Sequence, residues 1–149
     1  MNPSDVPPGP LLVDTDVFSF VTWGRDRYQD FVPLMQGHLL VLSFATVAEL
    51  RYGALHAAGA WPPARHQKLE KNIRRHVVIS ATDAVTRKWA ELFVKFRHQL
   101  RGDDRGWHDM WTAACALAQP TPTPVVTNNR ADFERIATQF PLIVIHPDA

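Results

Sequence analysis

Short apolar runs alternate with segments of helical periodicity along nearly the whole sequence, and this alternation constrains the fold more than any other feature. Runs of strand length lie at residues 11–13, 38–43, 76–80, 125–126 and 142–145. Helices are predicted at residues 16–22, 26–36, 45–58, 64–75, 107–118 and 131–138, with a long helix after Thr82 or Asp83 and a polar loop at 101–106. Short apolar strands that alternate with helices favour a parallel sheet covered by helices on both faces. We therefore predict an α/β fold with a short parallel sheet of four or five strands, in which a ligand binds at the carboxyl ends of the strands.

The composition is that of an ordinary globular protein with one domain. The chain has 149 residues, of which 46% are hydrophobic and 21% are charged, enough to bury one substantial core. Residues 1–10 are rich in proline and lack the basic and apolar regions of a signal peptide. We expect them to form a flexible leader before a single domain at residues 11–149. No apolar run approaches the roughly 18 to 20 residues that span a bilayer, so we expect no membrane association.

The single cysteine and the net charge indicate the cellular compartment of the protein and the kind of ligand it can attract. Cys115 cannot form an internal disulfide, which suits a reducing compartment, and we expect a cytoplasmic location. Because Cys115 lies on the apolar face of its predicted helix, we expect it to be inert core. The net charge of +1 does not mark a general nucleic-acid binder, so local patches must attract any polyanionic substrate.

Four acidic residues have apolar or strand-end surroundings instead of solvated ones. Asp14 ends the first strand, Glu49 lies among apolar residues of a helix, Asp109 is placed in the first turn of an apolar helix, and Asp132 follows the fourth strand. Each also has a purely structural explanation. Asp109 would favour the helix macrodipole, Asp132 would cap or flank a helix start, and Glu49 would face solvent. Asp16, close to Asp14, can cap the helix that follows.

Taken together, these acids indicate a site for a divalent metal ion. If the strand ends bring them to one side of the sheet, they repel one another, and some must take up protons at neutral pH. Carboxylates with water suit Mg²⁺ or Mn²⁺, whereas zinc needs histidine or cysteine, and the seven histidines show no paired ligand spacing. The sequence has no G-x-S-x-G motif and no Walker-type glycine loop. A metal-activated water is therefore the candidate nucleophile.

Four motifs in order resemble one known family. They are V-D-T-D at 13–16, A-E-L at 48–50, H-D-M-W-T-A-A at 108–114 and T-N-N-R-A-D-F at 127–133. Together they are similar to a PIN domain, and most similar to the small bacterial VapC-type toxins of toxin–antitoxin systems. The resemblance implies a PIN-like three-layer α/β/α domain and a ribonuclease dependent on Mg²⁺ or Mn²⁺. Such an enzyme would cleave RNA by metal-activated water and leave a 5′-phosphate and a 3′-hydroxyl, with an acid such as Glu49 orienting the water.

The resemblance also assigns candidate catalytic and metal-binding residues. Asp14, Glu49 and Asp109 match the first three acidic positions of the family. For the fourth position, some members carry their acid where this chain has Asn129, and others place it before the phenylalanine, as Asp132 is placed here. We choose Asp132, with Asn129 as a polar neighbour.

Other polar residues are expected to support the acids. Many relatives have asparagine where this chain has Asp16, which either binds metal or organises the loop. The hydroxyls of Thr15 and Thr127 are candidates for contacts with the water shell of the metal or with the scissile phosphate.

Basic residues near the motifs are candidates for RNA binding. Arg51 and Arg130 are preferred because they are neighbours, in sequence, of the proposed site. Further cations that can bind phosphates, or simply form a solvated helix face, are Lys68, Lys71, Arg74, Arg75, Arg101 and Arg105.

The resemblance implies partners as well. VapC-type toxins form homodimers and are silenced by an antitoxin whose helical tail fills a groove beside the site. Candidates to line this groove or the dimer contact, each of which also suits the core, are Trp23, Tyr28, Phe31, Tyr52 and Trp61.

Two rival functions remain. The segment D-T-D-V at 14–17 fits the opening motif of haloacid dehalogenase-type phosphatases, in which Asp14 would be the nucleophile. That reading leaves Glu49 and residues 127–133 without a role. The second rival is a PIN-like module that binds protein or RNA without catalysis.

Overall fold

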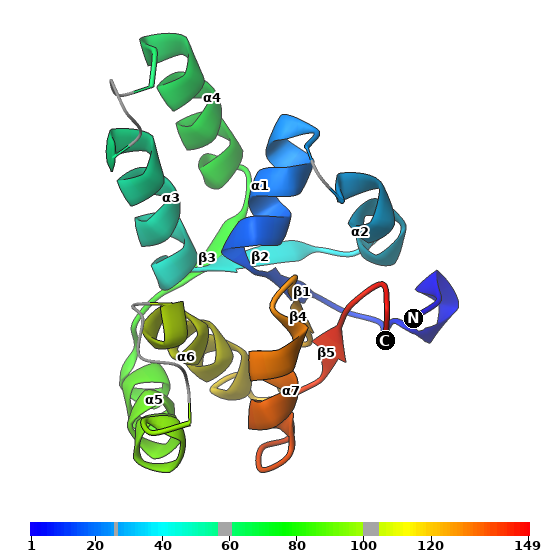
Figure 1. Ribbon diagram of the computed structural model, residues 1–149, viewed down its shortest axis with the longest axis vertical. Coiled ribbons are helices and arrows are strands. Elements are labelled where there is room, and N and C mark those ends of the chain that lie inside the picture. The colour runs from blue at the N-terminus through cyan, green and yellow to red at the C-terminus, as the bar shows by residue number, and fades with distance from the viewer. Residues whose placement is uncertain (26, 57–60, 100–104) are drawn as a thin grey trace.

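Five parallel strands form one sheet at the centre of the protein, as the sequence predicts (Figure 1). The computed structural model describes residues 1–25, 27–56, 61–99 and 105–149. The strand order is β3-β2-β1-β4-β5, so the sheet has the predicted parallel α/β form. The strands are β1 (Leu11–Val13), β2 (Leu40–Ser43), β3 (Val77–Ile79), β4 (Val125–Val126) and β5 (Val144–Ile145).

The order of the strands creates a switch point beside β1. The chain adds β2 and β3 on one side of β1, and then adds β4 and β5 on its other side. Leu12 therefore pairs with Val41 of β2 and with Val125 of β4. Because all neighbours are parallel, the carboxyl ends of β1, β2 and β4 reach the same edge of the sheet.

Helices cover both faces of the sheet and give three layers (Figure 1). In Figure 1 the first group lies above the sheet and the second below it. The first group is α1 (Thr15–Trp23), α2 (Tyr28–Met35), α3 (Phe44–His56) and α4 (Pro63–Arg74); the second is α5 (Asp83–Phe96), α6 (Arg105–Leu117) and α7 (Arg130–Ala137). All seven correspond to predicted helices, with ends shifted by a few residues.

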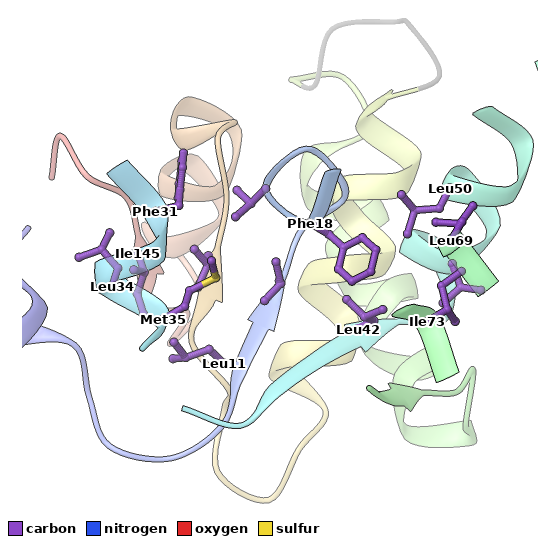
Figure 2. Close-up of a cluster of buried hydrophobic side chains, with 14 of the residues drawn as sticks. Leu11, Phe18, Phe31, Leu34, Met35, Leu42, Leu50, Leu69, Ile73 and Ile145 are labelled. Atoms are coloured by element: carbon purple, nitrogen blue, oxygen red, sulfur yellow. The ribbon is translucent and has the colours of Figure 1, made fainter. Parts of the chain in front are cut away.

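The alternation of side chains along the strands divides the core into two clusters. Leu11 and Val13 point to the cluster under α1–α4, whereas Leu12 points to the cluster under α5–α7. Figure 2 shows the first cluster, where Phe18 and Leu42 lie between the sheet and the helices. Because the side chains on both faces of the sheet are apolar, polar side chains of the strands can reach solvent mainly at the ends of the strands.

Local signals set the helix ends. The Thr82 hydroxyl accepts a hydrogen bond of 3.3 Å from the backbone N–H of Val85, so Thr82 is the cap of α5 and Asp83 is its first residue. Gly24 ends α1 with φ of 60°, a left-handed conformation that glycine adopts without a steric penalty. The predicted loop at 101–106 lies largely outside the described residues, and α6 begins at Arg105, two residues before its predicted start.

Residues 1–10 are predicted to form a flexible leader, and in the structure both Met1 and Val6 contact the rest of the domain. A short 3₁₀ helix (Pro3–Asp5) precedes Val6, which is buried in the core under α2. The amino group of Met1 donates to the carbonyl of Pro147 at 2.7 Å and also to that of Ala149.

Among the described residues, no helix is long and apolar enough to cross a membrane.

The buried central strand generates a stability prediction. Leu12 is fully buried at 0% exposure, so Leu12→Ala removes packed atoms and leaves a cavity. We expect a loss of about 2–5 kcal/mol in the free energy of unfolding, measured by urea denaturation. Leu55→Ala is the control, because Leu55 is 71% exposed, and we expect a change within about 0.5 kcal/mol. Equal effects of the two substitutions would contradict the assigned core.

Candidate active site

Asp14 lies at the switch point, directly after β1. Its carboxylate accepts hydrogen bonds of 2.8 Å from the backbone N–H of Thr15 and 2.8 Å from the hydroxyl of Thr127, the residue that follows β4. The Asp14 side chain thus caps α1 and joins the ends of two neighbouring strands. Burial raises its pKa to about 6, although both hydrogen bonds favour the charged form and act against this rise.

Asn129 connects two further acids. Its side-chain amide donates to Asp109 Oδ2 at 2.7 Å and to Asp132 Oδ2 at 2.9 Å, and its backbone N–H donates to the Thr127 hydroxyl at 2.9 Å. The structure therefore places both alternatives for the fourth acidic position together. Asp132 supplies the carboxylate, and Asn129 supplies the donor that holds it beside Asp109.

The setting of Asp109 corrects one expectation. Because α6 begins at Arg105, Asp109 lies in the second turn of its helix and not in the first, so the macrodipole of the first turn does not explain it. Burial and the nearby charge of Asp14 raise the pKa of Asp109 to about 8, and the charges of Asp132 and Glu49 add to the rise. An acid placed among other acids in this way is costly to ionise without a cation.

Glu49 reaches the same group from α3. Its Oε1 atom lies 2.9 Å from Nδ1 of His108, the residue before Asp109. Burial raises the pKa of Glu49 to about 7; hydrogen bonding from Thr15 opposes this rise, and the charge of Asp14 adds to it. The structure thus brings all four predicted acids to one edge of the sheet, whereas the contact with His108 was not predicted.

A buried network of hydroxyl groups lies between the same elements. Ser43, at the end of β2, accepts from the backbone N–H of Thr46 at 3.0 Å and lies 3.2 Å from the hydroxyl of Thr112 on α6. The Thr15 hydroxyl donates to that of Thr46 at 3.3 Å. Apart from Thr15, these residues were missed in the sequence, where their signal is a polar residue at the end of an apolar strand or on the apolar face of a helix.

Asp16, which is also predicted to support the site, is exposed in the first turn of α1. Its charge contributes to the raised pKa values of Asp14 and Glu49. Asp16 therefore adds to the negative field of the site, and a role as a metal ligand stays a prediction.

The donor set suits a hard divalent cation. Four carboxylates converge, and three of them have raised pKa values because burial and neighbouring negative charges oppose ionisation. In the described part of the chain, no three Asp, Glu, His or Cys side chains already form a metal-binding group. Mg²⁺ commonly takes one or two protein carboxylates directly and keeps several waters, so a looser cluster fits it better than it fits zinc.

The predicted RNA-binding arginines are already paired. Arg51 makes two hydrogen bonds, of 2.9 and 3.0 Å, with Glu70 on α4. Residues two apart on a helix point in nearly opposite directions, so closeness to Glu49 in sequence does not place Arg51 in the site. Arg130 bonds to Glu134 and to the carbonyl of Asp148, each at 2.6 Å. Arg101 lies outside the described residues.

The predicted aromatic residues separate into core and surface. Phe31 is fully buried in the core, so of its two predicted places the structure selects the core. Trp23 and Trp61 pack edge to face at 5.3 Å, with the Arg65 guanidinium 3.8 Å from the centre of the Trp61 ring. Tyr52 is exposed on α3. The prediction of an interface therefore survives for surface residues only.

A parallel sheet between two helical layers, with acidic residues at the carboxyl ends of its strands, is typical of α/β domains that bind a ligand at that edge. The family model described as "PIN domain" matches residues 11–139. The chain belongs to the PIN domain family. A comparison with curated proteins found no match.

Several solved structures share this fold. A chain of the VapBC2 complex from Rickettsia felis, bound to a promoter DNA fragment, is 22% identical with a TM-score of 0.70, over 91% of this chain and 97% of that one. A chain of VapBC-1 from nontypeable Haemophilus influenzae is 22% identical with a TM-score of 0.69, over 94% and 99%. A chain of FitAcB from Neisseria gonorrhoeae is 23% identical with a TM-score of 0.67, over 92% and 97%.

The raised pKa values predict how the metal-free protein responds to pH. Asp14, Glu49 and Asp109 hold their protons to about pH 6, 7 and 8 in the folded state, above the usual carboxyl range of the unfolded chain. The folded state therefore binds more protons, and the contribution of these groups to the free energy of unfolding should fall as the pH rises from about 4 to 8. The slope is at most about 1.4 kcal/mol per pH unit for each group.

Asp109→Asn tests this prediction. The substitution removes one of the mutually repelling charges, so we expect a flatter pH dependence in urea denaturation of metal-free protein between pH 6 and 9. Asp83→Asn is the control, since the Asp83 side chain is 80% exposed on α5. If Asp109→Asn has the same pH dependence as the wild type, the acids do not repel one another as described.

Proposed function

We propose that this protein is a metal-dependent ribonuclease and the toxin of a VapC-type toxin–antitoxin pair. The observation that carries the proposal is the convergence of Asp14, Glu49, Asp109 and Asp132 at the switch point of a PIN domain. The fold shared with chains of VapBC complexes supports the toxin assignment. We further propose that it acts in the cytoplasm, where its RNA substrate is found.

The residues of the site have distinct tasks in this proposal. The four acids would hold Mg²⁺ or Mn²⁺, which supplies the positive charge that activates a water and offsets charge developing on the phosphate. Thr127 fixes the Asp14 carboxylate by its 2.8 Å hydrogen bond. Asn129 holds Asp109 and Asp132 next to each other despite their repulsion. We propose that the Thr15 hydroxyl contacts the phosphate or the water shell of the metal.

RNA must also be held beside the acids, which repel its phosphates. Arg51 and Arg130 remain our proposed phosphate-binding residues. Each would exchange an exposed carboxylate partner, Glu70 or Glu134, for a phosphate. Since exposed ion pairs are worth about 0–1 kcal/mol, this exchange costs little.

The rival functions have less support. Family membership leaves the haloacid dehalogenase reading without a basis, because that chemistry uses Asp14 alone as nucleophile and gives Glu49 no task. A non-catalytic module would not need buried acids that raise one another's pKa values.

Asp14→Asn tests the catalytic proposal. We expect Mg²⁺-dependent cleavage of RNA to fall by more than roughly 100-fold, since losing only a contact behind a metal ligand costs about 10- to 100-fold. Asparagine can still accept from Thr15, so the melting temperature should stay within a few degrees of the wild type. Cleavage is measured on total RNA with mapping of the cut ends, with EDTA as the blank. Asp83→Asn serves as the control, and full activity of Asp14→Asn would exclude the proposed site.

Co-purification tests the proposed partners. Expressed alone, the protein should have the mass of a homodimer in light scattering and should cut RNA. Expressed with the product of the adjacent gene, it should form a larger complex with reduced nuclease activity. A monomer whose activity is unaffected by that product would contradict the toxin assignment while leaving the nuclease assignment intact.

A further inference from the structure

One histidine of the site has no task in the proposed function. His108 lies next to Asp109 on α6, and its Nδ1 atom is 2.9 Å from Oε1 of Glu49 on α3. The His108 side chain is 40% exposed, so it is not retained chiefly to fill the core. This contact is directed at an acid whose neighbours Asp14 and Asp16 are negative.

The contact joins two elements of the site. When Glu49 is ionised, as a metal ligand must be, a protonated Nδ1 of His108 at 2.9 Å can interact favourably with Oε1. From the other side, the hydroxyl of Thr15 at the start of α1 lies near enough to the Glu49 carboxyl group to favour its charged form. A long flexible side chain is thus held at its carboxylate by contacts from α1 and from α6.

Helix α6 places both groups in one rigid unit. Adjacent residues on a helix are about 100° apart, so Asp109 and His108 point in different directions from the same turn. Asp109 accepts the amide of Asn129, and His108 contacts Glu49. A movement of α6 relative to α3 would therefore move the Asp109 carboxylate and the His108 imidazole, which contacts Glu49, at the same time.

We propose that His108 is a positioning residue that fixes the Glu49 carboxylate for binding of the divalent cation. This inference rests on the proposed function. Carboxylate ligands of metal sites are in turn hydrogen-bonded, and loss of such a contact typically weakens metal binding about 10- to 100-fold. His108 binds neither the metal nor the substrate and acts through Glu49.

Mn²⁺ binding to the metal-free protein tests the role without depending on activity. His108→Leu replaces the imidazole with an apolar side chain of similar width that cannot donate, and we expect Mn²⁺ affinity in calorimetry to fall about 10- to 100-fold. His108→Asn places an amide nitrogen where Nδ1 lies, so it should recover affinity to within a few-fold of the wild type. His98→Leu is the matched control, since His98 is an exposed histidine beyond α5. It should bind Mn²⁺ like the wild type.

A double-mutant cycle separates positioning from a general structural effect. If His108 acts through Glu49, His108→Leu should not weaken Mn²⁺ binding further when Glu49→Gln is already present. At saturating Mn²⁺, the KM for RNA should be close to that of the wild type in both His108 variants.

Three results would overturn the positioning role. These are unchanged Mn²⁺ affinity in His108→Leu, equal loss in His108→Leu and His108→Asn, or a raised KM for RNA with normal Mn²⁺ affinity, which would indicate direct phosphate binding. If the wild type itself binds no Mn²⁺, the proposed function fails together with this inference. If the wild type binds Mn²⁺ and cuts RNA while His108→Leu binds equally well, only the role of His108 fails.

Discussion

The parallel pairing of β1 between β2 and β4 is the constraint on which the other features depend. Because helices cover both faces of the sheet, the side chains of β1 must be apolar on both faces, and Leu11, Leu12 and Val13 are. The first place where this strand can carry a polar group is its carboxyl end. Asp14 takes that place, and parallel pairing puts Ser43 and Thr127 at the ends of the flanking strands.

The same geometry gathers charges that repel one another. Burial of Asp14, Glu49 and Asp109 raises the pKa of each of these carboxyl groups, and the negative charges of their neighbours add to the rise, so the folded protein tolerates an unfavourable arrangement. Polar groups on different elements make it possible: Thr127 donates to Asp14, Asn129 donates to Asp109 and Asp132, and His108 lies 2.9 Å from Glu49. Local instability of this kind is typical of functional sites, because a ligand of opposite charge can relieve it.

Much of the fold was predictable from local patterns. Each predicted strand and helix within the described residues is present, and Thr82 caps α5 as its hydroxyl suggests. The one error among the acidic residues arose at a helix boundary. Asp109 was assigned to a first turn because the start of α6 was placed two residues late. The direction of Arg51 also depends on helical rotation: its guanidinium pairs with Glu70, and its binding of phosphate stays a prediction.

The sequence by itself determined the helices and strands, their parallel pairing and the acids that follow the strand ends. These properties depend on the local periodicity of apolar residues and on which residues follow each apolar run. It also provided the resemblance to PIN domains through four ordered motifs. Only the tertiary structure decided which donor meets which acid. The bond from Thr127 to Asp14 joins residues 113 positions apart, and the contact of His108 with Glu49 depends on how α6 is rotated against α3. Strand order and helix rotation are set by packing of the whole core, so no local pattern encodes these pairs.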